Sequence, residues 1–154
     1  MNQIVIGKRL TFEAAFAYSN RNLPGELCVL ANADIYFDHT LAALRNAKSL
    51  NGKVYALLRW DVTTSASLRF CPRIDQQDAW IYTPPLPSME CDFPLGLLRS
   101  DNRIAQVLED EGFELANPAL VVTARHLQLS QRRGYTEQDT VPGRTRYIRI
   151  AAAL

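Results

Sequence analysis

The chain has 154 residues, of which 47% are hydrophobic and 21% are charged, and its formal net charge is +1. This length suits one domain with a sizeable core, and the composition excludes a disordered, collagen-like or coiled-coil chain. The near-neutral charge argues against a generally basic nucleic-acid-binding protein. We therefore expect residues 1–154 to form a single domain with no nucleic-acid partner.

Apolar runs along the chain are short, and stretches such as Val54–Leu58 fall far below the ~20 residues of a membrane-spanning helix. The first residues lack the charged region and long apolar region of a secretory signal. Three cysteines without a C-x-x-C spacing favour reduced thiols, with Cys28 buried in an apolar run. These features predict a cytoplasmic protein with no membrane span.

In the first half of the chain, apolar runs alternate with helical patterns. Strands are predicted over Gln3–Ile6, Glu26–Ala31 and Lys53–Trp60. Between them, one helix is expected to begin at Thr11 and end before Leu23–Gly25, and a second to be capped by Asp38 and end before Asn51–Gly52. Their apolar faces comprise Phe12, Ala15 and Phe16, and Leu41, Leu44 and Ala47.

In the second half, a loop is expected over Asp61–Pro72, followed by a short strand over Ala79–Tyr82 and a proline-rich surface segment. Ser100 is predicted to cap a helix that Gly112 ends, with an apolar face of Ile104, Ala105, Val107 and Leu108. A further strand over Leu120–Thr123 would lead towards His126. This alternation of strands and helices predicts an α/β fold with a largely parallel sheet.

Polar side chains follow the most apolar predicted strand. Asn32 and Asp34 stand two residues apart, so they would point to the same side of an extended chain. Ligands bind at the carboxyl ends of strands in open α/β sheets, and Mg²⁺ or Mn²⁺ prefers oxygen ligands there. The alternative is that Asp34 forms a turn and that Asp38 only caps a helix, and for Asp38 we favour the cap.

Three further groups leave their roles open. Asp78 precedes Trp80 at the start of a strand, a position typical of a turn. Asp101 falls in the first turn of a helix, where a carboxylate ordinarily offsets the helix dipole. His126 is a candidate ligand, although a single histidine of this kind is more often a structural hydrogen-bonding residue.

The order of these groups carries more information than each alone. The segments concerned are Gly7–Phe12, Ala31–Asp38, Gln77–Tyr82, Asp92–Gly96, Ser100–Ala105, Asn117–Pro118 and His126–Ser130. Together they resemble the C-terminal portion of a bacterial and viral glycosyltransferase-like family with the GT-A fold, from about Ile4 to about Ile150. The resemblance implies a Rossmann-like three-layer sandwich with a largely parallel or mixed sheet, shortened at its N-terminal, nucleotide-binding part.

The resemblance also implies a metal site. Asn32 and Asp34 would correspond to the D-x-D-type motif that holds Mn²⁺ or Mg²⁺ against the diphosphate of a nucleotide-sugar donor. His126 would be a late metal ligand or phosphate contact. Where a second histidine is expected, the chain has Gln128.

The remaining roles concern the acceptor, a glycan or other hydroxyl compound. Asp101 would be the general base, and the substrate-binding residues would be Asp78, Trp80, Asn102 and Arg103. A helix N-terminus and the neighbouring Arg99 both lower the pKa of an acid, so this role requires burial of Asp101 by the substrate.

Glycosyl transfer is therefore the leading functional hypothesis, with a shortened, non-catalytic domain that binds a glycan or a partner protein as the alternative. A metal-dependent phosphoesterase would use the same carboxylates with water as the nucleophile. Nucleic-acid binding by the basic C-terminal segment, which includes Arg132–Arg133, ranks last because Tyr135 and Tyr147 are its only aromatic residues. A homo-oligomer, in which a second copy covers a sheet edge left open by the short N-terminus, is a further alternative that the sequence leaves open.

Overall fold

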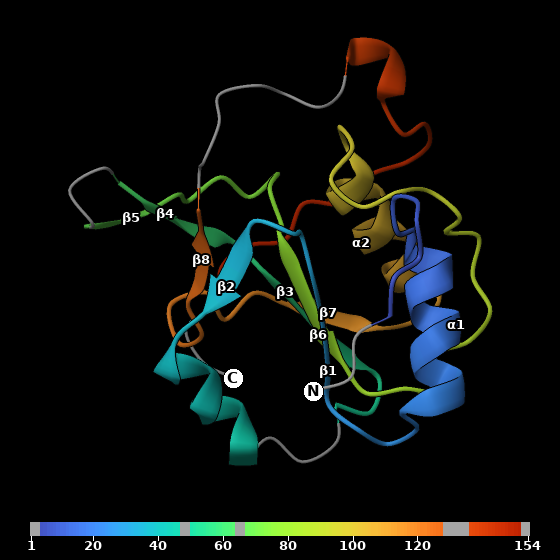
Figure 1. The fold of residues 1–154 in the computed structure, drawn as a ribbon, viewed down its shortest axis with the longest axis horizontal. Coiled ribbons are helices and arrows are strands. Elements are labelled where there is room, and N and C mark those ends of the chain that lie inside the picture. The colour runs from blue at the N-terminus through green and yellow to red at the C-terminus, as the bar shows by residue number, and fades with distance from the viewer. Residues whose placement is uncertain (1–3, 47–49, 64–66, 128–135, 152–154) are drawn as a thin grey trace.

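The computed structural model describes residues 4–46, 50–63, 67–127 and 136–151 (Figure 1). Its helical segments are α1 (Phe12–Asn22), α2 (Ser100–Asp110) and the 3₁₀ helices η1 (His39–Asn46) and η2 (Glu137–Asp139). The first sheet has the strand order β1 (Cys28–Ala31), β6 (Ala79–Tyr82), β3 (Lys53–Leu57), β7 (Glu114–Ala116). The second sheet has the order β2 (Ile35–Phe37), β8 (Ala124–His126), β4 (Arg59–Val62), β5 (Leu68–Phe70).

The α/β class is confirmed, but the sheets are mixed rather than largely parallel. Among the described strands, only β3 with β7 and β4 with β8 pair in parallel. The other pairs, including β6 with both β1 and β3, are antiparallel. The largely parallel sheet predicted from alternation was wrong because β1 and β3 continue directly into strands of the second sheet, and β6 pairs antiparallel with both of them; a mixed sheet is the other form that the resemblance implied.

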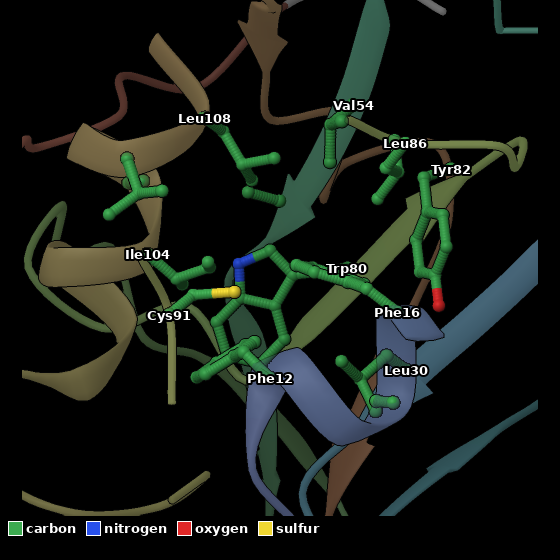
Figure 2. Close-up of a cluster of buried hydrophobic side chains, with 14 of the residues drawn as sticks. Phe12, Phe16, Leu30, Val54, Trp80, Tyr82, Leu86, Cys91, Ile104 and Leu108 are labelled. Carbon is green, nitrogen blue, oxygen red and sulfur yellow. The ribbon is translucent and has the colours of Figure 1, made fainter. Parts of the chain in front are cut away.

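The first sheet separates two hydrophobic clusters and so forms the middle layer. On one face, α1 and α2 pack against β1, β3 and β6 around Trp80, as Figure 2 shows. On the other face, η1 and the inner side of the second sheet contribute Leu44, Ile35 and Ala124 to a second cluster with Leu57. Figure 1 shows the same order, with α1 and α2 on one side of the first sheet and β2 and β8 on the other.

The helix predicted from Thr11 is confirmed. The Thr11 Oγ1 accepts a hydrogen bond from the Ala14 amide at 3.2 Å, and the helix ends where Leu23 caps it. Its buried residues include Phe12 and Phe16, which pack their rings against Trp80 and Tyr82 respectively. Cys28 is buried in β1, as the apolar run predicts.

The predicted helix after Asp38 forms as η1, a 3₁₀ helix. Asp38 accepts hydrogen bonds from the Thr40 amide and hydroxyl, which confirms its capping role. Arg125 also binds the Asp38 carboxylate, at 2.6 Å. At α2, the expected cap is displaced by one residue: Arg99 holds the N-cap position with a φ of 67°, and the Ser100 hydroxyl donates to the Leu97 carbonyl.

Other strand predictions were wrong in their limits. Ile4–Ile6 forms no strand and is exposed, and the run over Lys53–Trp60 divides at Leu58, whose amide donates to the Asn117 side chain instead of to a neighbouring strand. The expected loop over Asp61–Pro72 contains the β4–β5 pairing, and β7 was missed. Leu120–Thr123 lies at a turn closed by the Pro118 carbonyl, and β8 follows it.

Some predictions lie outside the described residues. They concern Gln3, Ala47, Gln128, Arg132–Arg133 and Tyr135.

Candidate functional site

His126 and Asp34 meet where β8 runs beside β2. Asp34 closes the turn between β1 and β2, and His126 lies opposite Ile35, the first residue of β2. The distance from His126 Nε2 to Asp34 Oδ2 is 3.2 Å. The side chain of Asp34 is 52% exposed and that of His126 is 9% exposed, so this pair lies at the protein surface.

Asp61 holds the other side of the imidazole, a contact that sequence reasoning missed. Strand β4 pairs in parallel with β8 and places Asp61 opposite His126, with Oδ1 3.0 Å from Nδ1. Arg59 Nε lies 3.0 Å from the same carboxylate oxygen. The alternation Arg59–Trp60–Asp61 puts both charged residues on one face of a strand, but the predicted strand ended at Trp60 and left Asp61 in a loop.

Asn32 does not join Asp34 in this arrangement. Strand β1 ends at Ala31, so the two residues lie in a turn, where the alternation expected for an extended chain does not hold. The Asn32 Nδ2 donates to Asp78 Oδ1 at 2.9 Å, and its backbone amide donates to the Asp78 carbonyl. The Asn32 Oδ1 is buried without a hydrogen-bond partner among the described residues.

Asp78 lies between the Asp34–His126 pair and Asp101. Burial raises the pKa of Asp78, and the nearby Arg59, 3.6 Å from its Oδ2, and the Asn32 hydrogen bond oppose that increase. Electrostatically, His126 lowers and Asp34 raises the pKa of Asp78, and Asp78 raises the pKa of Asp101. We call Asp34, Asp61, Asp78, Asp101 and His126, together with Arg59 and Asn32, the polar cluster.

Asp101 is partly buried by the protein itself. Burial raises its pKa to about 7, against hydrogen bonds from backbone amides at the start of α2 and from the Gln77 amide at 3.1 Å. The guanidinium of Arg99 donates to the Gly143 carbonyl at 3.3 Å. The expectation that only a bound substrate would bury Asp101 was therefore wrong: desolvation already outweighs the helix N-terminus.

The other residues predicted to bind substrate contact other parts of the protein instead of the polar cluster. Trp80 has no exposed surface and packs edge-on against Phe12, 4.9 Å between ring centroids, so it faces the helices and not the polar cluster (Figure 2). Asn102 is buried and donates to Gln77 Oε1 and the Arg146 carbonyl. Arg103 lies over Gly143 and reaches the Arg144 carbonyl.

The donors at the surface of the polar cluster fit a divalent cation in part. Two ligand atoms at right angles around an octahedral cation stand about 3 Å apart, close to the 3.2 Å between Asp34 Oδ2 and His126 Nε2. Two protein ligands leave room for water and phosphate oxygens, as Mg²⁺ sites commonly do. Within the described ranges, no cluster of three or more His, Cys, Asp or Glu side chains has the arrangement of a metal site.

Two cavities open elsewhere, beside α2. One, of about 880 Å³, includes Arg103, Cys91 and the carboxylates of Glu13, Glu90, Asp92, Asp110 and Glu111. The other, of about 920 Å³, lies between α2 and the Arg144–Arg149 segment. Asp34, Asp101 and His126 line neither of them.

Comparison with known proteins places the chain in no group: no family model, curated protein or solved structure matches it. None of the helices within the described ranges combines the length and apolar character needed to cross a membrane.

Proposed function

We propose that the chain is a GT-A-like domain that transfers a sugar from a nucleotide-sugar donor to a hydroxyl acceptor. One observation carries this proposal: residues from five separate segments, which include the motifs behind the family resemblance, converge in the polar cluster. Its carboxylates and histidine come from the β1–β2 turn, β4, the residue before β6, the start of α2, and β8.

Asp34 and His126 would hold the divalent cation, which would neutralise the charge that develops on the diphosphate leaving group. Asp34 supplies a half-exposed carboxylate that faces solvent, where a charged donor can approach. His126 is buried and contacts Asp34 through Nε2 and Asp61 through Nδ1. The protein therefore presents one exposed ligand and one buried ligand at this position.

Asp101 would accept the proton from the acceptor hydroxyl while the acceptor oxygen forms its bond to the sugar and the bond to the diphosphate breaks. A carboxyl group with a pKa of about 7 is a stronger base than an ordinary aspartate and is still largely ionised just above neutral pH. Burial is the source of this basicity.

Sugar transfer by the purified chain tests the proposal, with a panel of nucleoside diphosphate sugars, simple sugar acceptors and Mn²⁺. We expect Asp101→Asn to lower the rate at least about 100-fold, which is the usual contribution of a general base. Asp34→Ala should also lower the rate, because it removes a ligand of the cation. Asp110→Asn, an exposed site at the other end of α2, should leave the rate unchanged. Transfer that survives both cluster variants would contradict the proposal, and glycan binding without transfer would favour the non-catalytic alternative.

A further inference from the structure

The imidazole of His126 is enclosed by two carboxylates that differ in exposure. Asp61, on its Nδ1 side, is 8% exposed as a residue, whereas the side chain of Asp34, on its Nε2 side, is 52% exposed. Water competes for the Asp34 contact and hardly at all for the Asp61 contact, so the buried carboxylate is the stronger acceptor. A neutral imidazole carries one N–H, and this difference favours its location on Nδ1.

Asp61 is itself held in place from two directions. Arg59 Nε lies 3.0 Å from Oδ1, and Arg69 lies 3.6 Å from Oδ2. The strand register fixes the backbone as well, because Asp61 stands directly opposite His126 in the parallel β4–β8 pair. Neither the carboxylate nor the ring can turn without breaking several contacts.

With the proton on Nδ1, the Nε2 lone pair would face the Asp34 carboxylate at 3.2 Å, an arrangement that repels unless a divalent cation, or a second proton on Nε2, supplies a positive charge between the two atoms. Metal-binding histidines in proteins commonly donate their second N–H to a carboxylate, which fixes the tautomer and the ring orientation. The Asp61–His126 contact has this form, with Asp61 outside the set of direct ligands.

We propose that Asp61 is a positioning residue. It accepts a hydrogen bond from the Nδ1–H of His126 and thereby keeps the Nε2 lone pair directed at a divalent cation, which Asp34 also binds. This inference rests on the proposed cation site. Arg59 extends the arrangement, because its guanidinium lies between Asp61 and Asp78 and thus links the histidine to the rest of the cluster.

The test combines a measurement on the metal-free protein with a binding measurement. Nitrogen-15 NMR of the full chain, labelled at histidine, reports which ring nitrogen carries the proton when the ring is neutral. The chain has 2 histidines, so His39 serves as an internal reference. We expect the Nδ1–H tautomer at His126 in the wild type and a shift towards Nε2–H in Asp61→Leu. Asp61→Asn should be intermediate, because its amide oxygen still accepts a hydrogen bond from Nδ1–H.

Calorimetric titration with Mn²⁺ then measures affinity in the same proteins. We expect Asp61→Leu to bind Mn²⁺ about 10- to 100-fold more weakly than the wild type, which is the usual effect of losing such a partner. Asp110→Leu is the matched control, because it makes the same substitution at an exposed carboxylate outside the polar cluster. Both its tautomer and its affinity should match the wild type.

Asp61→Asn provides the same comparison if the leucine variant does not fold. The inference is overturned if a folded Asp61 variant keeps the wild-type tautomer, or keeps the tautomer change but binds Mn²⁺ as tightly as the wild type. Failure of the wild type to bind Mn²⁺ would instead reject the cation site of the proposed function, and the tautomer comparison would separately decide whether Asp61 orients the ring.

Discussion

Single residues in the polar cluster depart from what their local sequence implies. Asp101 occupies the first turn of a helix, a position that ordinarily lowers the pKa of a carboxyl group, yet its pKa is raised to about 7. Desolvation is the largest contribution, and the charge of Asp78 adds to it. Tertiary burial has thus reversed the sign of a local effect.

The raised pKa predicts a pH-dependent stability. The folded-state value of about 7 exceeds the ordinary 3.8, so the folded protein holds this proton more tightly than the unfolded chain does. The stabilisation that protonated Asp101 contributes is complete below about pH 4 and is lost as the pH rises to about 7. Asp101→Asn should therefore be more stable than the wild type at pH 8, by about 4 kcal/mol, because the pKa difference is about 3 units and each unit corresponds to about 1.4 kcal/mol.

Urea unfolding from about pH 5 to about pH 8 measures this difference. The wild type should lose stability over this range, and Asp101→Asn should lose much less. Asp110→Asn, on the same helix but exposed, should follow the wild type. Parallel curves for wild type and Asp101→Asn would show that Asp101 is ionised as easily in the folded chain as in the unfolded one.

The sequence identified some members of this site and could not identify others. Asp34, Asp78, Asp101 and His126 were selected from their types and order, and the structure brings them together. Asp61 was missed because its partner lies 65 positions away along the chain and is set by strand pairing. Asn32 was given the wrong partner because a turn begins directly after β1.

At the scale of elements, local signals located the helices better than the strands. Thr11 and Gly112 mark the start of α1 and the end of α2 through capping and backbone geometry, which are properties of a few adjacent residues. The strand limits depend on distant partners. Leu58, for example, ends β3 because Asn117 binds its amide, and no pattern within Lys53–Trp60 indicates this.

Gly112 provides a test of the α2 terminus. Its φ is 86°, and an added Cβ would meet no atom within 4 Å, so only the backbone conformation opposes a side chain. Gly112→Ala should lower the free energy of unfolding by about 1–2 kcal/mol. Glu111→Ala, at the neighbouring cap with a φ of −84°, should change it by less than about 0.5 kcal/mol. Equal effects in urea unfolding would contradict this account of the helix end.

At the scale of the whole molecule, the first sheet contributes side chains to both hydrophobic clusters, one on each of its faces. Trp80 on one face contacts the helical layer, and its neighbours Ala79 and Ile81 on the other face contribute to the second cluster. The arrangement was not predictable from alternation of strands and helices, because β6 pairs with strands that precede it by many residues. The polar cluster lies where the second sheet meets the end of this layer.

The burial of Trp80 in the core indicates that it stabilises the fold and does not bind substrate. Trp80→Ala should lower the free energy of unfolding by about 3–5 kcal/mol, because it removes a fully buried indole from the core. Tyr147→Ala, at a residue that is 53% exposed, should have an effect below about 0.5 kcal/mol. The Mn²⁺ affinity of the folded fraction should remain that of the wild type in both variants. A loss of affinity in folded Trp80→Ala would indicate that the core and the polar cluster are coupled.

The most direct test of the central claim is thermal stabilisation by nucleoside diphosphate sugars, with and without Mn²⁺, in the wild type and in Asp34→Ala. A ligand that binds the native state raises its stability, by about 2.7 kcal/mol at a hundredfold excess over its dissociation constant. We predict a stabilisation by at least one donor that requires Mn²⁺ and disappears in Asp34→Ala. The absence of stabilisation by every donor, or an equal stabilisation of both proteins, would contradict donor binding at the polar cluster.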